Sequence, residues 1–468
     1  MNSDSNHSPG VSKCVEAAKI LSAEREEALK RAQTMKFDTI AVHGLYTVEE
    51  ALRRNRGSVI EPLYLSTSQA YADADELEAA LAYLTPSWCY TRIANPTTQY
   101  LEWTLALLEG YRTGYETSCL VTSSGMSAIA AAVDPFLVKQ KSGPEEINFV
   151  SSIQIYGGTY QYFSVRKAKE QGIEARWVQN PDDLEEWKAR IDGNTRFLYM
   201  EMPSNPQQSF ADLKSLVDLA HSWGIPFIID STCATPALMR PIEYGADVVV
   251  HSLTKSITAS GLAIGGAVIS RRPIITNVKN DNPNFKENFA EYVKLWPFRD
   301  TGPAASPVNA LFALNDLRTL RSRMELVSRN CQIVAGYLAG HDRVSRVDYL
   351  GLPACRLHEV AKKYMKLVDS DDGSGREVNC YGHLMSFTVD GPPENARKVF
   401  DSFKLIHRAT DLGRIKSLAT IPAISTHLQQ GEEVRRLANI PPQLIRLCVG
   451  AEHPDDVIAD LKQALAVL

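Results

Sequence analysis

The stretch from Ile225 to Arg271, IPFIIDSTCATPALMRPIEYGADVVVHSLTKSITASGLAIGGAVISR, decides the fold of this chain. It contains two short apolar, β-branched runs, IPFIID and ADVVVHS, and each run is closed by polar residues. Such runs predict two buried parallel strands, and the segment between them is long enough for a crossover. Both strands therefore end at the same edge of the sheet, where open α/β sheets place their ligands.

Two ionisable residues follow these strands. Asp230 closes the first strand, and Lys255 comes a few residues after the second. Pyridoxal phosphate needs such a pair, because an amine forms a Schiff base with its aldehyde while a carboxylate keeps its ring nitrogen protonated. Taken alone the pair is weak support, since most aspartates after strands are turn residues and most lysines are solvated. The surrounding sequence decides the interpretation.

The sequence around Lys255 carries a family resemblance. Ser252 and Thr254 flank the lysine with hydroxyls suited to a phosphate, and a glycine-rich apolar run follows. The segments DSTCATP, RPIEYGADVVVHSLTK and IGGAVIS resemble the cofactor-lysine region of the Cys/Met metabolism (transsulfuration) family of PLP-dependent enzymes. The resemblance covers nearly the whole chain after about residue 36, and its sulfhydrylase and cystathionine γ-synthase members are the most similar.

The family implies a fold and a domain plan. The fold is the α/β type I fold of PLP-dependent transferases, as in aspartate aminotransferase. It has a mostly parallel sheet with helices on both faces and a smaller C-terminal α/β domain; the strand, turn and helix rhythm from Cys119 to Val268 agrees. We expect an N-terminal arm over 1–60, a large domain over 61–300 and a C-terminal domain over 301–468 that begins with a long bridging helix. Within the last, the polar segment 368–380 is expected to be a mobile loop.

Composition excludes several partners. Lys plus Arg number 50 against 55 for Asp plus Glu, so the net charge of −5 gives no footprint for nucleic acid or an anionic membrane. No run reaches the ~18 apolar residues of a membrane span. The eight cysteines form no C-x-x-C pair and no metal-ligand spacing, so no metal site is expected. We expect a cytoplasmic enzyme with reduced cysteines.

The resemblance assigns further cofactor contacts. Backbone N–H groups at a helix start, together with Ser hydroxyls, make an anion site, but an S-S-G turn before an Ala-rich helix is by itself weak evidence because Ser is also a common N-cap. The family places its phosphate loop there, at Ser124, Gly125 and Met126. It also implies that Tyr156 stacks on the cofactor ring, that Asn205 meets the ring oxygen, and that Thr232 belongs to the cofactor site.

Other residues are implied to bind substrate or a neighbouring subunit. Arg446 lies inside an apolar strand, where a guanidinium needs an anionic partner, and the family uses it for the substrate α-carboxylate. Ser417 is implied to help, and Lys416 precedes it. Tyr90 and Arg92 are implied to reach the site of the adjacent subunit, Tyr90 contacting substrate as well, so a homotetramer built from dimers with shared sites is expected.

The expected reaction begins with Lys255 as the base at the substrate Cα, with Tyr156 assisting proton transfer. Gly158 stands where methionine γ-lyases of the family carry Cys, and Lys416 would repel an ammonium-bearing thiol. We therefore predict γ-replacement on an O-acetyl- or O-succinyl-homoserine by a sulfur nucleophile.

Two alternatives stay open. One is a γ- or β-lyase acting on cystathionine, methionine or cysteine. The other is γ-replacement by an atypical, even carbon, nucleophile, because Ser231, Cys233 and the SITASG segment depart from the family pattern.

Overall fold

The large domain is built on a seven-stranded sheet. The computed structural model describes residues 8–139 and 146–468. The strand order is β1-β7-β6-β5-β4-β2-β3, and β7 alone runs antiparallel to its two neighbours. The strands are β1 (Glu116–Thr122), β2 (Asn148–Ser152), β3 (Glu174–Val178), β4 (Thr195–Glu201), β5 (Phe227–Asp230), β6 (Val248–His251) and β7 (Gly266–Arg272). The predicted mostly parallel sheet is confirmed.

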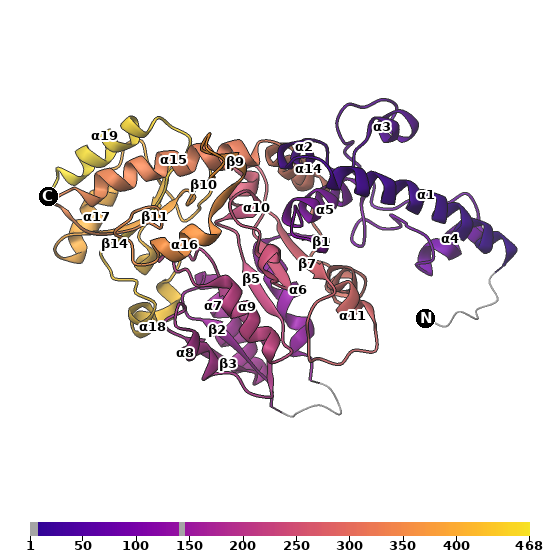
Figure 1. Cartoon of the computed structure of the whole chain (residues 1–468), viewed down its shortest axis with the longest axis horizontal. Helices are drawn as coiled ribbons and strands as arrows, with labels where there is room; N and C mark the ends of the chain where they lie inside the picture. The colour runs from indigo at the N-terminus through magenta and orange to yellow at the C-terminus, as the bar shows by residue number, and fades with distance from the viewer. Residues whose placement is uncertain (1–7, 140–145) are drawn as a thin grey trace.

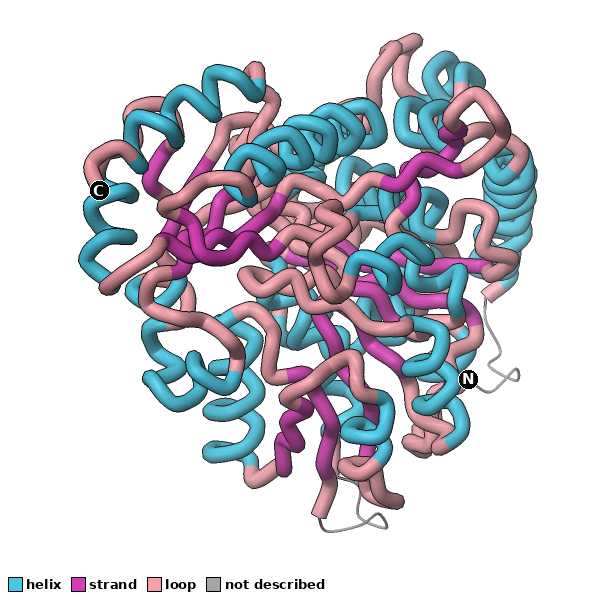
Figure 2. Tube along the Cα trace, turned by 60° about the vertical axis from the view of Figure 1, so that its left-hand side comes forward, coloured by secondary structure: helices cyan, strands magenta, loops and turns pink. Residues whose placement is uncertain are grey.

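Helices bury both faces of this sheet (Figures 1 and 2). In β6, Val249 packs into one hydrophobic cluster with α5 and α9, whereas Val248 and Val250 pack into the other with α6 and α12. Alternate side chains of a strand point to opposite faces, so a strand that is apolar throughout must be covered on both sides. The helices of this domain are α5 (Pro96–Glu109), α6 (Gly125–Val133), α7 (Gly157–Gln161), α8 (Leu184–Lys188), α9 (Leu213–Ser222), α10 (Thr235–Leu238), α11 (Asn284–Glu287), α12 (Phe289–Val293) and α13 (Arg299–Thr301).

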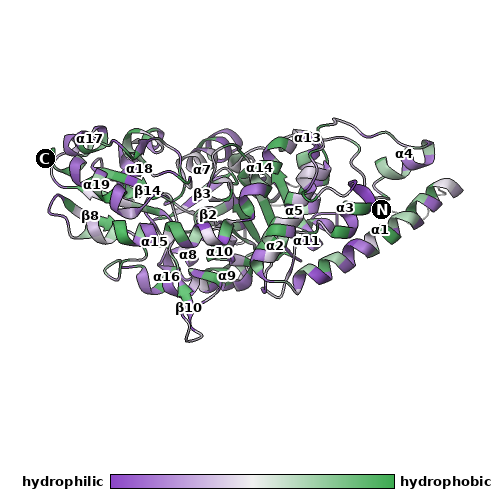
Figure 3. Cartoon of the chain, turned by 90° about the horizontal axis from the view of Figure 1, so that it is seen from above, coloured by the Kyte–Doolittle hydropathy of each residue, from purple (hydrophilic) through white to green (hydrophobic). Residues whose placement is uncertain are grey.

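The N-terminal part is helical and extends from one end of the molecule. Helix α1 (Pro9–Gln33) runs out along this end beside α4 (Ala74–Leu81), as the view from above shows (Figure 3). Ser8 caps α1 by accepting a hydrogen bond from the amide of Val11, and Pro9 suits the first helical turn. Two short helices, α2 (Phe37–His43) and α3 (Val48–Arg54), follow.

The C-terminal part forms a second, five-stranded sheet of order β12-β13-β14-β11-β8. Its strands are β8 (Val344–Asp348), β11 (Leu384–Val389), β12 (His407–Arg408), β13 (Leu418–Thr420) and β14 (Leu444–Cys448). Helices α15, α17 (Pro393–Asp401) and α19 (Pro454–Leu465) cover one face. Two further helices, α16 (His358–Tyr364) and α18 (Gly431–Leu437), complete the domain. The exact domain boundaries at 60 and 300 stay predictions.

Two expectations for this region are corrected. The long bridging helix is two helices, α14 (Pro307–Leu317) and α15 (Leu320–Ala339), because Thr319 leaves the helical conformation and its hydroxyl bonds the carbonyl of Asp316. The expected mobile loop over 368–380 contains a two-stranded sheet made by β9 (Lys366–Asp371) and β10 (Glu377–Asn379).

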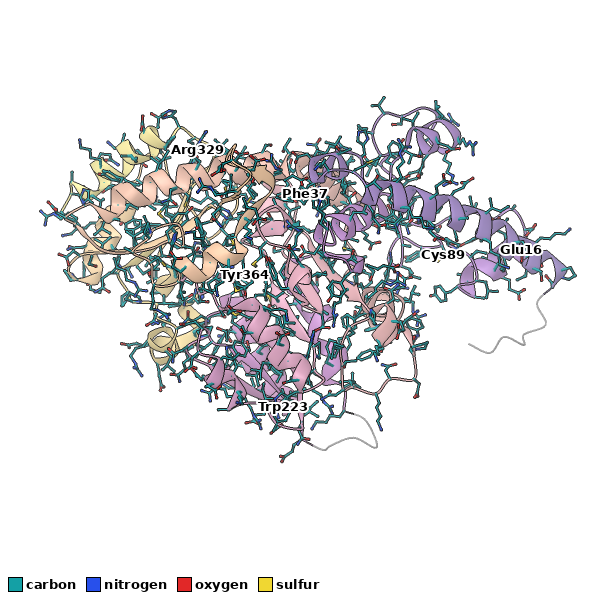
Figure 4. The ribbon with its side chains drawn as sticks, viewed as in Figure 1. Glu16, Phe37, Cys89, Trp223, Arg329 and Tyr364 are labelled. Carbon is teal, nitrogen blue, oxygen red and sulfur yellow. The ribbon has the colours of Figure 1, made fainter. Side chains whose placement is uncertain are left out.

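Tyr364 joins the two domains near the centre of the molecule (Figure 4). Its ring packs edge-on against Tyr244 with centroids 4.7 Å apart, and its hydroxyl donates to Asp212 at the start of α9 over 2.8 Å. The C-terminal domain is thereby fixed against the large one. Within 8–139 and 146–468, no helix is both long and apolar enough to cross a bilayer.

Candidate active site

The site begins at the carboxyl ends of three adjacent parallel strands. Glu201 ends β4, Asp230 ends β5 and pairs with Glu201 in register, and the turn after β6 carries Lys255. The sheet thus brings two carboxylates and one amine to one edge. Asp230 therefore closes β5 and Lys255 follows β6, and these two strands are adjacent and parallel.

Asp230 is buried, with 6 % of its surface exposed. Its Oδ1 accepts hydrogen bonds from the amide (3.0 Å) and the hydroxyl (2.5 Å) of Thr232, whose hydroxyl also accepts from the amide of Ser252 over 2.8 Å. Burial raises the pKa of Asp230 above its usual value, opposed by the bonds from Thr232. Thr232 therefore orients the carboxylate and ties it to the turn before Lys255.

Glu201 is a second buried carboxylate, which the sequence did not identify. It accepts hydrogen bonds from the amides of Asn205 (2.7 Å) and Tyr156 (2.6 Å). Burial, and then the charge of Asp230, raise the pKa of Glu201 well above its usual range. The sequence feature that could have identified Glu201 is its position at the end of an apolar strand, like that of Asp230. Glu201 holds the turns that present Tyr156 and Asn205.

Lys255 meets an acid from the C-terminal domain. Its Nζ lies 2.6 Å from Oδ1 of Asp411, and Arg414 holds the other oxygen of that carboxylate at 2.5 Å. The same guanidinium donates to the carbonyls of Thr254 (2.6 Å) and Thr258 (2.8 Å), on either side of the lysine. Asp411 and Arg414 were missed because no local pattern in DLGR places that loop beside Lys255.

The start of α6 offers donors for a phosphate. Ser124 caps this nine-residue helix in a reciprocal capping box with Ser127. The amides of Gly125 and Met126, first in the helix, have no intrahelical acceptor. A Cβ on Gly125 would lie 2.7 Å from that of Ser252, so the helix start and the turn after β6 are in direct contact. The hydroxyl of Thr254, in contrast, is bonded to both the carbonyl and the amide of Gly265.

Tyr156 stands beside this helix start with 38 % of its surface exposed. A Cβ on Gly158 would lie 2.5 Å from Cε1 of Tyr156 and 3.2 Å from the sulfur of Met126. A Cβ on Gly157 would lie 2.1 Å from the carbonyl of Thr426. Gly157 is therefore required by its contact with the backbone of Thr426, while a side chain at Gly158 would displace the Tyr156 ring. Burial, followed by the charge of Glu201, raises the pKa of Tyr156.

Arg446 comes from the centre of the second sheet and is fully buried. Its guanidinium donates to Oδ1 of Asn205 at 3.2 Å and to the carbonyls of Thr410 (3.0 Å) and Asp411 (2.7 Å). Its Nε has no partner among the described residues. Among residues 8–139 and 146–468 no carboxylate forms an ion pair with Arg446, so its Nε is left for an anionic ligand.

Ser417 and Lys416 are neighbours in the chain but differ in burial. Ser417 is fully buried, and its amide and hydroxyl donate to Glu452 over 2.6 and 3.0 Å, while the hydroxyl accepts from the amide of Gly450. Lys416 beside it is exposed. Glu452 therefore occupies the Ser417 hydroxyl that was expected to help hold the substrate.

The last two candidates, Tyr90 and Arg92, lie at the turn before α5. Tyr90 is 46 % exposed and forms a bridge with Ser68, and Arg92 donates to the carbonyl of Arg299. Their contacts in the described structure join them to residues 68 and 299–302. They are therefore placed at the surface of their own subunit.

These residues fit a PLP site of the type I fold. A lysine and a buried aspartate lie at the carboxyl edge of the sheet, the start of α6 and Ser252 provide phosphate donors, and Arg446 lacks an anion. Sequence comparison then identifies the family. The model for the Cys/Met metabolism PLP-dependent enzymes matches residues 38–466, and the chain belongs to that family.

Individual relatives support this family assignment. Homocysteine synthase of Schizosaccharomyces pombe is 33 % identical over 450 residues, covering 92 % of this chain and 98 % of the relative. L-methionine γ-lyase of Porphyromonas gingivalis is 32 % identical over 433 residues, covering 92 % and 96 %. The crystal structure of a putative O-acetylhomoserine (thiol)-lyase from Campylobacter jejuni superposes with a TM-score of 0.81 at 33 % identity, covering 92 % of this chain and all of that one. That structure contains a pyridoxyl-lysine phosphate residue. The cofactor is pyridoxal 5′-phosphate, and the type I fold is confirmed.

Proposed function

We propose that this enzyme replaces the γ-substituent of an activated homoserine ester, O-acetyl- or O-succinyl-homoserine, with a sulfur nucleophile. The observation that carries the proposal is that the Asp411 carboxylate meets Lys255 over 2.6 Å while the carbonyl of the same residue accepts from the buried Arg446 of the second sheet over 2.7 Å. This set suits an α-amino acid, whose carboxylate needs a cation and whose Cα needs a base. The relatives named for homocysteine synthesis supply the substrate class.

Arg446 binds the substrate α-carboxylate. Two of its nitrogens are held by Asn205 and by carbonyls of the loop before β13, and Nε remains for the ligand. Because the guanidinium is already oriented and desolvated, a carboxylate gains a strong charge-assisted bond there. Lys416 contributes positive charge at the surface.

The cofactor, when bound, supplies an electron sink for a carbanion at the substrate Cα. Asp230 stabilises a positive ring nitrogen, and the start of α6 with Ser252 holds the phosphate. Thr232, Asn205 and Thr254 position these groups. Lys255 removes the Cα proton. Tyr156 keeps its phenolic proton near neutral pH because its pKa is raised, so it can donate that proton as the γ-substituent leaves.

The lyase alternative is not favoured. Methionine γ-lyases of the family have Cys at the position of Gly158. The exposed Lys416 also disfavours an acceptor with an ammonium group and suits a small anion such as hydrosulfide.

We further propose a homo-oligomer in which Tyr90 and Arg92 complete the site of a neighbouring subunit. Both are exposed in their own subunit, and exposed apolar side chains of the segment before Ser68, at Val59, Ile60 and Leu65, suit an interface. Mixing inactive Arg92→Ala subunits with inactive Lys255→Ala subunits should restore part of the activity. Activity that stays absent after demonstrated subunit exchange would contradict the shared site.

We place the enzyme in the cytoplasm. All eight cysteines are free thiols in the structure, as a reducing compartment favours.

The main test uses the purified enzyme with O-acetylhomoserine, with and without sulfide. We expect the visible absorbance of the lysine-bound cofactor to change with the ester, and homocysteine to form only when sulfide is present. Lys255→Ala should remove that absorbance and lower activity roughly 10³-fold or more. Ammonia and a 2-oxo acid as the main products would instead support a lyase.

A further inference from the structure

The loop between β12 and β13 brings one carboxylate from the C-terminal domain to the cofactor lysine. Asp411 and Lys255 are 156 positions apart in the chain, yet their side chains are 2.6 Å apart. The carboxylate is partly shielded, with 31 % of its side chain exposed, and the lysine side chain is 25 % exposed. The lysine atom in this contact is Nζ, the nitrogen that reacts with the cofactor.

Several bonds fix the carboxylate in that position. Its Oδ1 also accepts from the amide of Leu412 (2.9 Å), and Oδ2 accepts from Arg414. Arg446 holds the carbonyl of Asp411 at 2.7 Å. A Cβ on Gly413 would lie 2.5 Å from the amide of Ser256, so the loop packs directly on the turn after Lys255. These contacts, together with the bond to Lys255, therefore hold the Asp411 carboxylate beside the lysine.

The charges around the pair are mostly positive. Arg414 and Arg446 contact the Asp411 loop, and Arg323 donates to the carbonyl of Ser256 at 2.7 Å. His383, beside Ser256, is neutral near pH 7 because burial lowers its pKa to about 4. Although burial acts against ionisation, the bond and charge of Lys255 lower the pKa of Asp411. Asp411 is thus a carboxylate at neutral pH.

We propose that Asp411 is a catalytic residue that stabilises the protonated form of the Lys255 nitrogen. The inference rests on the proposed function only in taking Lys255 as the cofactor lysine. When the neutral amine of Lys255 takes the Cα proton, the C–H bond breaks, its electron pair stays on the substrate, and a new N–H bond makes an ammonium. That ammonium pairs with Asp411, which keeps the proton in the site for return to the substrate. The same carboxylate favours the protonated nitrogen while Lys255 is bound to the cofactor.

The test is a pH titration of the visible absorbance of the holoenzyme. In Asp411→Asn, the midpoint of the pH-dependent change should move down by roughly 1 to 3 pH units, because a nearby negative charge is lost. Asp411→Glu should restore most of the shift. Asp316→Asn is the matched control: this carboxylate accepts from the amide of Ser260, in the loop that follows Lys255, without touching the lysine. Its midpoint should stay at the wild-type value.

Kinetics provide a second readout. Asp411→Asn should lower kcat roughly 10²-fold with little change in KM, since the carboxylate acts on the proton-transfer step. Asp411→Ser serves if the Asn variant does not fold. An unmoved midpoint in a variant that binds the cofactor would overturn this inference and leave the proposed function intact. A wild-type protein without the visible absorbance would overturn both.

Discussion

The Glu201–Asp230 pair at the cofactor edge and Asp460 in α19 are buried carboxylates in opposite settings. Asp460 accepts hydrogen bonds from the amides of Lys404 (2.9 Å), Leu405 (2.9 Å) and Ile406 (2.8 Å), and burial is outweighed so that its pKa is lowered. Glu201 and Asp230 face each other across adjacent strands, and their pKa values are raised. The buried Asp460 carboxylate therefore stabilises the C-terminal domain. The buried Glu201 and Asp230 carboxylates destabilise the large domain when they are ionised, at an edge that binds a ligand.

The pH dependence of the two regions has opposite sign. Asp460 has a lowered pKa, so its stabilising effect is present above the unfolded pKa of about 3.9 and is lost as pH falls through the folded value. Glu201 and Asp230 have raised pKa values, so their contribution is fully present below about 4 and is lost as pH rises through the folded values. The cofactor edge is therefore less stable near neutral pH than its packing alone implies.

The largest stability effect should follow Asp460→Ala. Three backbone amides would lose a charged acceptor, which should lower the free energy of unfolding by about 3 kcal/mol at neutral pH. Urea denaturation measures the change. The loss should shrink as the pH falls below about 4, because the wild-type carboxylate then protonates as well.

Asp455→Ala is the matched control for this variant. Asp455 lies in the first turn of the same helix, but its side chain is 80 % exposed and should contribute less than about 0.5 kcal/mol. Equal destabilisation by the two variants would contradict the contrast between a buried acceptor and a surface charge.

A smaller effect, of opposite sign, should follow Asp230→Asn. Both bonds from Thr232 go to Oδ1, so an amide oxygen can keep them, and the repulsion from Glu201 is removed. The cofactor-free protein should gain about 1 kcal/mol in unfolding free energy, while the holoenzyme should lose activity roughly 10²-fold. Urea denaturation and product formation are the measurements.

Asp247→Asn is the control for Asp230→Asn, because it makes the same substitution at another buried aspartate. Asp247 is equally buried but is paired with Arg271 at 2.7 Å, so the same substitution there should destabilise the protein. A loss of stability in both variants would contradict our account of the Glu201–Asp230 pair.

The sequence could predict the parts of the site that stand at strand ends. Asp230 and Lys255 follow apolar runs whose type and direction are readable locally, and Arg446 is conspicuous as a charge inside an apolar strand. Asp411 could not be predicted, because its position depends on how a loop of one domain packs on the other. Thr319 could not be recognised as a break either, since the apolar periodicity continues on both sides of it.

Strand β14 fixes which way Arg446 points. It lies between β11 and β13, and Arg446 is paired with Ser386 on one side and Thr420 on the other. Its neighbours Ile445 and Leu447 face the hydrophobic interior of the C-terminal domain. Deleting one residue within this strand would therefore exchange the two faces, driving a guanidinium into a layer of Ile, Leu and Phe side chains and turning leucine toward Asn205. Length changes within the five residues of this strand should thus not be tolerated.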